Sequence, residues 1–400
     1  MLINRAYKTE LEPNNAQRTA LLKHSGAARF AYNWGLARRK EEYEKTGKSS
    51  NAIELHRQLN ALKRTGFPWM YQVSKCAPQE ALRDLDRAFK NFFEGRAKYP
   101  KFRSRKRGIS SFRLTGSIRV FHGSIQLPRI GRVRLKEKDY LPTDKGAEVH
   151  ILSATVSERE GRRWFVSLQV EEKIEVSVNT GPVVGVDVGI SKLATLSDGA
   201  VIENPKALTR YERKMKRLHR SLSRKMKNSK NRLDARMQLA GCEFRIASIR
   251  RDAQHKATTM LARTKSVIGV ESLNLAGLLK NHRLAKQLAD AGLGEFFRQL
   301  KYKAQWYGGV VVEADPFFPS TKRCSNCGAV KDEMPLSERT YKCESCGFEA
   351  DRDLNAALNL ASSVAASWAE TLNARKSGEV HAARQVLLDE AGIEHHWGMS

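Results

Sequence analysis

The chain has 400 residues, enough for two or three domains that each bury a core. Its formal charge of +28 indicates a polyanionic partner, and the even spread of basic residues along the chain favours nucleic acid over a membrane. No run approaches the roughly 20 apolar residues of a membrane span and the start has no signal-peptide core, so we expect a cytoplasmic protein with no membrane partner.

The first hundred residues combine one strand with helices. Residues 2–11 alternate between apolar and polar side chains, which predicts a strand. Three amphipathic stretches after it predict helices at residues 16–37, 53–65 and 78–94. We expect the aromatic side chains of the third helix to lie in the core: Phe89, Phe92 and Phe93.

A strongly basic run follows at residues 96–107, with seven cationic and two aromatic side chains. Such a run is often only a solvated linker. Interleaved rings and cations also stack on unpaired bases and neutralise phosphates, and the charge of the whole chain favours this interpretation. The candidate nucleic-acid-binding residues here are Lys98, Lys101, Arg103, Arg105, Lys106 and Arg107.

From residue 111 to about residue 175 the pattern changes to short alternating segments separated by glycine-containing turns. This pattern is typical of a small antiparallel barrel or sandwich. The strand at residues 2–11 is a candidate member of the same sheet, which would make the helical region an insertion within it.

Three carboxylates occupy comparable positions farther along the chain. Asp187 lies near the end of an apolar run, and Glu271 directly follows another. Asp353 falls in the first turn of a helix that we expect to begin at residues 350–351. Each acid alone is more simply explained as a salt-bridge partner or a helix cap. Together, in strand, strand and helix, they fit a ribonuclease-H-like sheet and predict a cage for divalent cations, which prefer oxygen ligands.

Between the first two acids, residues 204–264 predict two helices that are separated at Asn228 and Ser229. Cations recur on nearly every turn with few acids to pair with them, so we interpret the helix pair as a phosphate-binding surface rather than a solvated coiled coil. The candidate residues are Arg217, Arg220, Arg224, Lys225, Lys230 and Arg232.

Four cysteines form two Cys-x-x-Cys-Gly segments separated by fifteen residues. Two such knuckles are typical of a tetrahedral thiolate site for one structural Zn²⁺ ion, with no open position for chemistry. The predicted ligands are Cys324, Cys327, Cys343 and Cys346.

Several of these segments together resemble the TnpB (OrfB) proteins of bacterial insertion sequences. The resemblance covers roughly residues 3–365 and is carried by GVDVGISKLATLSDG, SVIGVESLNLAGL, PSTKRCSNCG, YKCESCGFEADRDLNAALNL, RSLSRKMKNSKNR, RRDAQHKATTML and LEPNNAQRTALLKHSGAARFAYNWGLA. It implies an RNA-guided DNA endonuclease related to type V CRISPR effectors. The partners would be a guide RNA from the end of the mobile element and a duplex DNA target beside a short motif.

The resemblance also implies an α/β plus β-barrel architecture. An RNase H-like (RuvC) nuclease core with a helical insertion and a zinc ribbon would follow a wedge β-barrel that carries an inserted helical recognition region. The expected segments are the wedge (1–12 and 110–180), the recognition region (13–109), the nuclease core (181–319 and 350–372, with its basic insertion at about 205–263), the ribbon (320–349) and a poorly ordered tail (373–400).

Asp187, Glu271 and Asp353 would then be the catalytic triad and would hold two Mg²⁺ ions, or Mn²⁺ in their place. In the family's DRDxNAA pattern the second acid is the ligand, which favours Asp353 over Asp351. Three alternatives stay open: a guided repressor that does not cut, a transposase acting in strand transfer, and a zinc-ribbon DNA-binding protein without activity. The oligomeric state is also open, with a monomer on the guide RNA favoured.

Overall fold

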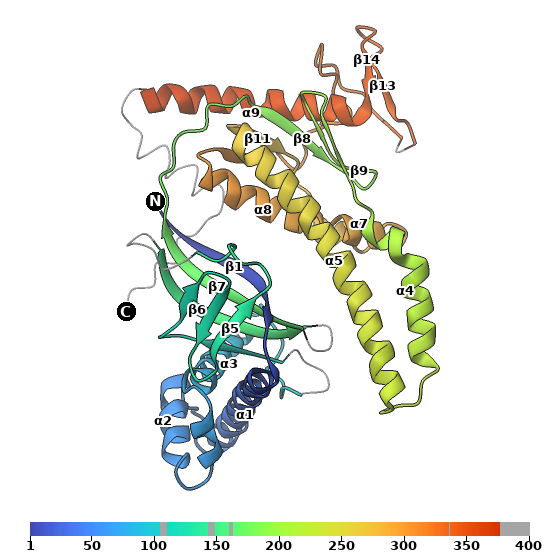
Figure 1. The fold of residues 1–400 in the computed structure, drawn as a ribbon. Coiled ribbons are helices and arrows are strands. Elements are labelled where there is room, and N and C mark those ends of the chain that lie inside the picture. The colour runs from blue at the N-terminus through green and yellow to red at the C-terminus, as the bar shows by residue number, and fades with distance from the viewer. Residues whose placement is uncertain (105–109, 143–148, 160–162, 336, 377–400) are drawn as a thin grey trace. The chain divides into compact units, whose positions relative to one another are not determined.

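The computed structural model describes residues 1–104, 110–142, 149–159, 163–335 and 337–376 (Figure 1). The chain divides into two compact units, Met1–Glu175 and Val176–Ser400. Part of the predicted tail, residues 377–400, lies outside the described residues, whereas residues 373–376 belong to the last helix.

The first unit is built on a seven-stranded sheet in the order β2-β6-β7-β1-β5-β4-β3. Its strands are β1 (Leu2–Glu12), β2 (Ser111–Leu114), β3 (Arg119–Phe121), β4 (Ser124–Leu127), β5 (Gly131–Leu135), β6 (Val149–Arg159) and β7 (Arg163–Lys173). All the paired strands are antiparallel. The order ends at β2 on one side and β3 on the other, and these two edge strands are not paired with each other among the described residues.

The chain's first strand lies inside this sheet. Every residue from Leu2 to Leu11 of β1 is paired with β7, and the far end of β1 also pairs with β5. The helices between β1 and β2 are α1 (Asn15–Thr46), α2 (Ala52–Leu62), a 3₁₀ turn (Pro68–Gln72) and α3 (Cys76–Phe93). The helical region therefore interrupts a sheet whose strands come from both sides of it.

Local sequence explains where these helices begin. Asn14 accepts a hydrogen bond from the Gln17 main chain while the Gln17 side chain accepts one from Asn14, which is a capping box. Asn51 and Glu54 form the same arrangement at the start of α2. Each box satisfies main-chain donors that the first helical turn leaves unpaired.

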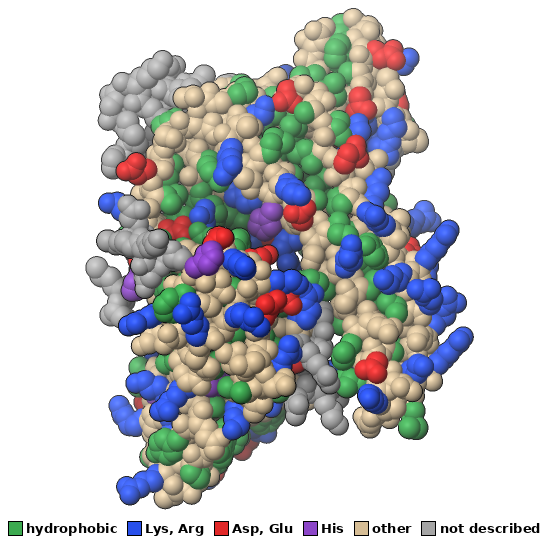
Figure 2. All heavy atoms as spheres, viewed as in Figure 1, with side chains coloured by type: hydrophobic (Ala, Val, Ile, Leu, Met, Phe, Trp, Pro, Cys, Tyr) green, Lys and Arg blue, Asp and Glu red, His purple; other side chains and the backbone are tan. Residues whose placement is uncertain are grey.

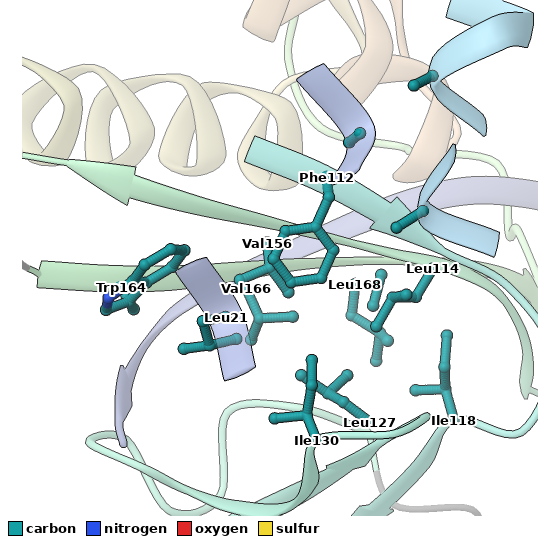
Figure 3. Packing of buried hydrophobic residues seen from close by; sticks show 14 of the residues in the cluster. Leu21, Phe112, Leu114, Ile118, Leu127, Ile130, Val156, Trp164, Val166 and Leu168 are labelled. Atoms are coloured by element: carbon teal, nitrogen blue, oxygen red, sulfur yellow. The ribbon is translucent and has the colours of Figure 1, made fainter. Parts of the chain in front are cut away.

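One hydrophobic core joins the helices to the sheet. Leu21 of α1 packs with Phe112, Val156, Val166 and other apolar side chains of the strands (Figure 3). The prediction for the aromatic residues of α3 is confirmed for Phe89, is not confirmed for the half-buried Phe92 and was wrong for Phe93. Phe89 packs against this core, but Phe93 is 78% exposed and leans on Phe89 and Phe92 from outside.

The second unit contains a five-stranded sheet in the order β10-β9-β8-β11-β12. Its strands are β8 (Val184–Val188), β9 (Lys192–Leu196), β10 (Val201–Glu203), β11 (Val267–Val270) and β12 (Val310–Glu313). β8, β9 and β10 run antiparallel, whereas β11 is parallel to both β8 and β12.

Helices connect and cover this sheet. They are α4 (Ala207–Ser223), α5 (Lys230–Thr264), α6 (Leu275–Leu278), α7 (Ala285–Ala291), α8 (Leu293–Trp306) and α9 (Arg352–Lys376). Leu261 of α5 and Phe296 of α8 share a hydrophobic core with Val184 and Val186, which lie on one face of β8. α9 covers the other face.

Two glycines let α9 approach that face closely. Gly185 of β8 and Gly269 of β11 are neighbours in the parallel register. A Cβ on Gly185 would overlap the main-chain oxygen of Ala357, and one on Gly269 would lie 2.8 Å from that of Leu360. The main chain of α9 therefore lies directly on the sheet at the centre of this face.

A small ribbon connects β12 to α9. It contains the two Cys-x-x-Cys segments and the antiparallel strands β13 (Thr340–Lys342) and β14 (Glu349–Asp351). Here the prediction that the last helix begins at residues 350–351 was wrong. Both residues belong to β14, and α9 begins at Arg352.

Candidate active site and metal centre

Two of the predicted acids lie at the same end of neighbouring parallel strands. Val186 of β8 pairs with Val270 of β11, so Asp187 is the next residue of β8 and Glu271 directly follows the end of β11. Side chains alternate along a strand, which puts Asp187 on the same face as Gly185 and Glu271 on the same face as Gly269. That is the face covered by α9.

The third acid comes from α9 itself. Asp353 lies in its first turn. Asp351, just before the helix, uses Oδ1 to accept hydrogen bonds from the main-chain N–H groups of Asp353 (2.9 Å) and Leu354 (3.2 Å). Its other oxygen, Oδ2, lies 3.4 Å from Lys192 Nζ. Asp351 thus caps the helix, and Asp353 is the acidic residue of the first turn.

Electrostatics connect the three carboxylates. Burial, together with the negative charges of Glu271 and Asp353, raises the pKa of Asp187 from 3.8 to about 8. The Arg352 guanidinium opposes this shift. Negative charge is therefore crowded around Asp187, which is the condition that a bound cation relieves.

The spacing of these acids differs from that of a single-ion cage. Within the described residues, the cluster whose ligand atoms all lie within 4.8 Å of one another is the four cysteines, and the three acids do not form such a cluster. Two ions held about 3.5–4 Å apart need ligands spread more widely than one ion does. All three acids are only half-buried, so the site is open to a substrate.

A serine that the sequence interpretation missed also contacts this site. The buried Ser320 donates its hydroxyl hydrogen to Glu271 Oε1. Its position four residues before the first predicted thiolate is the only signal that the sequence offered, and that signal pointed to the ribbon rather than to the acids.

The four predicted thiolates converge. Cys324 Sγ lies 3.7 Å from Cys346 Sγ, and Cys327 Sγ lies 3.6 Å from Cys343 Sγ. A tetrahedral ion with bonds of about 2.3 Å to each sulfur requires sulfur atoms about 3.8 Å apart. The cluster therefore has the dimensions of a Cys₄ site that could hold zinc.

The two knuckles repeat one main-chain conformation. Gly328 and Gly347 have positive φ angles of 80° and 72°, and each donates its N–H to the carbonyl of the first cysteine of its segment. Main-chain N–H groups, that of Cys346 first, lower the pKa of the Cys343 thiol to about 6. The turn of the second segment therefore favours the thiolate form of Cys343, which is the form that binds a metal.

Lys and Arg side chains gather over α4 and α5 (Figure 2). Of the six residues predicted there, five are exposed: Arg217, Arg220, Arg224, Lys225 and Lys230. Arg232 is half-buried, and its Nη1 donates to the carbonyl oxygens of Leu222 (2.7 Å) and Lys225 (2.9 Å). These contacts join the end of α4 to the start of α5 and give Arg232 a structural role at this junction.

In the basic run of the first unit, Lys98 and Lys101 are exposed. Arg103 is held against α1: its guanidinium lies 3.7 Å from the centre of the Tyr32 ring, and its main-chain N–H and carbonyl bond to the Asn33 side chain. The remaining predicted residues of the run, Arg105, Lys106 and Arg107, lie outside the described residues.

Known relatives match nearly the whole chain. A protein named "Putative RNA-guided DNA endonuclease" from Streptomyces pristinaespiralis is 37% identical over 368 residues, 91% of this chain and 90% of the relative. The "Putative RNA-guided DNA endonuclease InsQ" of Escherichia coli K12 is 32% identical and covers 89% of this chain and 91% of its own length. The chain belongs to the TnpB (OrfB) family. The resemblance inferred from the sequence is confirmed.

Family models match three parts of this TnpB-family chain. The one described as "Probable transposase" matches residues 165–282, and the one described as "Cas12f1-like, TNB domain" matches residues 294–360. A third, described as a helix-turn-helix domain, matches residues 1–48. In this structure that last segment contains β1 and the single long helix α1.

The fold is shared with a CRISPR effector. A Cas12f1 chain solved by cryo-electron microscopy with its guide RNA and target DNA matches at a TM-score of 0.50 and 17% identity, covering 85% of this chain and 81% of that one. At this identity the match shows the fold alone. Among the described residues, no helix has the length and apolar character needed to cross a bilayer.

Proposed function

We propose that this chain is an RNA-guided DNA endonuclease that cleaves duplex DNA beside a short flanking motif. The observation that carries the proposal is the convergence of Asp187, Glu271 and Asp353 on one side of the second unit's sheet. The names and near-complete coverage of the relatives support it. The guide RNA would come from the end of the mobile element, and base pairing rather than protein side chains would select the target.

The three acids suit two divalent ions, Mg²⁺ or Mn²⁺. Their ligands are oxygens, they are half-buried, and their negative charges are crowded. When bound, two ions stabilise the attacking and leaving oxygens of phosphodiester hydrolysis. Water attacks phosphorus and the bond from phosphorus to the 3′ oxygen breaks, which leaves a 3′ hydroxyl and a 5′ phosphate. The protein's own part is to hold the three carboxylates around the reacting phosphate.

The domain assignment is part of the proposal. An order of three antiparallel strands followed by two parallel ones supports an RNase H-like (RuvC) core at 181–319 and 350–372, with the basic helix pair at about 205–263 as its insertion. The thiolate cluster supports a zinc ribbon at 320–349. The interrupted sheet supports a wedge at 1–12 and 110–180 with a recognition region at 13–109.

Two alternatives share this architecture. A guided repressor would bind target DNA without cutting it, and a transposase would join DNA ends, since RNase H-like cores serve both hydrolysis and strand transfer. The presence of all three acids favours cutting over repression. A zinc-ribbon protein without activity would leave the crowding of charge at Asp187 unexplained.

The test begins with the protein purified together with its RNA. We expect the co-purified RNA to contain one discrete transcript, and we expect linear target DNA to be cut only when Mg²⁺ is present. Asp187→Ala should abolish cutting and retain the RNA. The control Asp252→Ala changes an exposed acid that pairs with Lys256 on α5 and should cut at the wild-type rate. Bulk cellular RNA, joined DNA ends, or cutting by Asp187→Ala would each contradict the proposal.

A further inference from the structure

The buried asparagines of α9 make unusual contacts. Asn355 and Asn359 lie one turn apart and are 0% and 3% exposed. Both are bonded to the segment that leads into the first cysteine knuckle rather than to other parts of α9. A buried amide is costly unless its hydrogen bonds are made, so this segment and α9 fix each other's position.

Asn355 holds the main chain on both sides of the first thiolate, Cys324. Its Nδ2 donates to the carbonyl oxygen of Arg323 at 2.8 Å, and its Oδ1 accepts from the N–H of Ser325 at 3.0 Å. Asn355 follows Asp353 by two residues on the same helix. The main chain of the first knuckle is therefore hydrogen-bonded to the part of α9 that also carries Asp353.

Asn359 extends the same contact toward the second acid. Its Nδ2 donates to the carbonyl oxygens of Arg323 at 2.7 Å and Ser320 at 2.8 Å. Ser320 in turn donates its hydroxyl hydrogen to Glu271 Oε1. The two asparagines and Ser320, whose carbonyl bonds to Asn359 and whose hydroxyl bonds to Glu271, thus connect the knuckle and α9 to the Glu271 carboxylate.

We propose that Ser320 is a positioning residue for Glu271, and that Asn355 and Asn359 couple the cysteine knuckle to the orientation of that carboxylate. The inference rests on the proposed ion site and assigns the ribbon a part in forming it. A hydroxyl bonded to Oε1 restricts the rotation of the Glu271 side chain and leaves Oε2 for an ion. Outer partners of this kind commonly change metal affinity by about 10- to 100-fold.

Mn²⁺ binding tests the first step without any cleavage assay. Free Mn²⁺ is measured by electron paramagnetic resonance while it is titrated into the zinc-loaded full-length protein without nucleic acid. Ser320→Ala should weaken Mn²⁺ binding about 10-fold with one zinc per chain retained, and Ser320→Thr, which keeps a hydroxyl, should restore most of the affinity. The matched control is Ser325→Ala, because Ser325 joins the network through its main-chain N–H.

The Mn²⁺ affinities of the variants distinguish a failure of the positioning role from a failure of the proposed ion site. Equal Mn²⁺ affinity in wild type and Ser320→Ala would overturn the positioning role, and so would an equal loss in Ser325→Ala. If Asp187→Ala binds Mn²⁺ as the wild type does, the ion site itself is wrong and both proposals fail.

Asn359→Ala tests the coupling through α9. We expect weaker Mn²⁺ binding in this variant even though its side chain is not bonded to Glu271. Circular dichroism at low temperature checks that the helices remain. A folded Asn359→Ala protein with wild-type Mn²⁺ affinity would overturn the coupling, whereas loss of affinity together with an intact zinc site would support it.

Discussion

At the scale of single residues, the surroundings of Asp187 lower the stability of the folded protein whenever its carboxyl group is charged. Burial and two neighbouring acids raise its pKa to about 8. Between about pH 4 and pH 8 the folded protein therefore binds one proton more than the unfolded chain at this position. The free energy of unfolding contributed by Asp187 is fully present below its unfolded pKa and is lost as the pH rises toward 8.

The direction of this pH dependence predicts how an uncharged residue at position 187 changes stability. Asp187→Asn should leave the stability of the magnesium-free protein nearly unchanged at about pH 3.5, below the unfolded pKa of the carboxyl group, and raise it by at least about 1 kcal/mol at pH 8. Urea unfolding at the two pH values measures the difference. Asp252→Asn, at an exposed position, should show the wild-type pH dependence. An Asp187→Asn protein whose stability follows the wild type at both pH values would contradict the assigned cause.

Substitutions of the two nearby acids Asp351 and Asp353 should have different effects on stability and on DNA cutting. Asp351→Ala removes a helix cap and should lower stability by about 1 kcal/mol while DNA cutting continues. Asp353→Ala should abolish cutting with little change in stability. Urea unfolding and single-turnover cleavage measure the two effects. Full loss of cutting in Asp351→Ala alone would reverse the assignment.

At the scale of elements, the contact of α9 with the sheet depends on the absence of two side chains. Gly185 and Gly269 allow the helix backbone to lie on β8 and β11, and α9 brings Asp353 to the ends of those strands. A longer residue at either glycine would push the whole helix outward. The position of the third acid is therefore set by packing several residues away from it.

Gly185→Ala should lower the free energy of unfolding by about 1–3 kcal/mol, because its methyl group meets main-chain atoms of α9 that cannot move independently. It should also reduce the cleavage rate by displacing Asp353. Gly241→Ala is the matched control: Gly241 lies inside α5 with open space around it, so alanine should stabilise the protein by about 0.4–1 kcal/mol. Urea unfolding of both variants measures the contrast.

Sequence alone identified the elements whose signals are local. The apolar strands before Asp187 and Glu271 and the repeated Cys-x-x-Cys-Gly segments each carry their pattern within a few residues. The start of α9 was misplaced because Asp351 both ends a strand and caps a helix. In such a case the boundary depends on pairing with β13, which no local pattern records.

The network at Ser320, Asn355 and Asn359 was missed for a related reason. Each side chain bonds to a segment distant in sequence, and an asparagine in a helix looks the same whether it faces solvent or another backbone. Exposure of Phe93 was missed because helical spacing places it beside Phe89 without showing where the core ends. Charge alone also does not reveal that Arg232, unlike its exposed neighbours, donates to carbonyl oxygens.

At the scale of the whole molecule, a formal charge of +28 makes binding to nucleic acid depend strongly on salt. The exposed cations of α4 and α5 are candidates for phosphate contacts, and none of them is needed to choose a sequence if base pairing does so. Their contribution should therefore be similar for every guide.

This predicts a difference between two arginines of the same helix pair. Arg224→Ala should weaken binding of the co-purified RNA and reduce the slope of log affinity against log salt by about 1, with stability unchanged. Arg232→Ala should leave that slope unchanged and instead destabilise the junction between α4 and α5. Filter binding at several salt concentrations and thermal unfolding measure the two effects. Equal slopes in Arg224→Ala and wild type would remove Arg224 from the binding surface.

The position of α9 at the end of the described chain has a consequence for biosynthesis. On the ribosome, Asp187 and Glu271 emerge well before the ribbon and the helix that supplies Asp353. If the three acids form the proposed ion site, the nascent chain lacks one of the ligands until α9 has packed on Gly185 and Gly269. A message truncated within residues 320–349 would encode Asp187 and Glu271 without Asp353, and the proposed site then predicts a product that does not cut DNA.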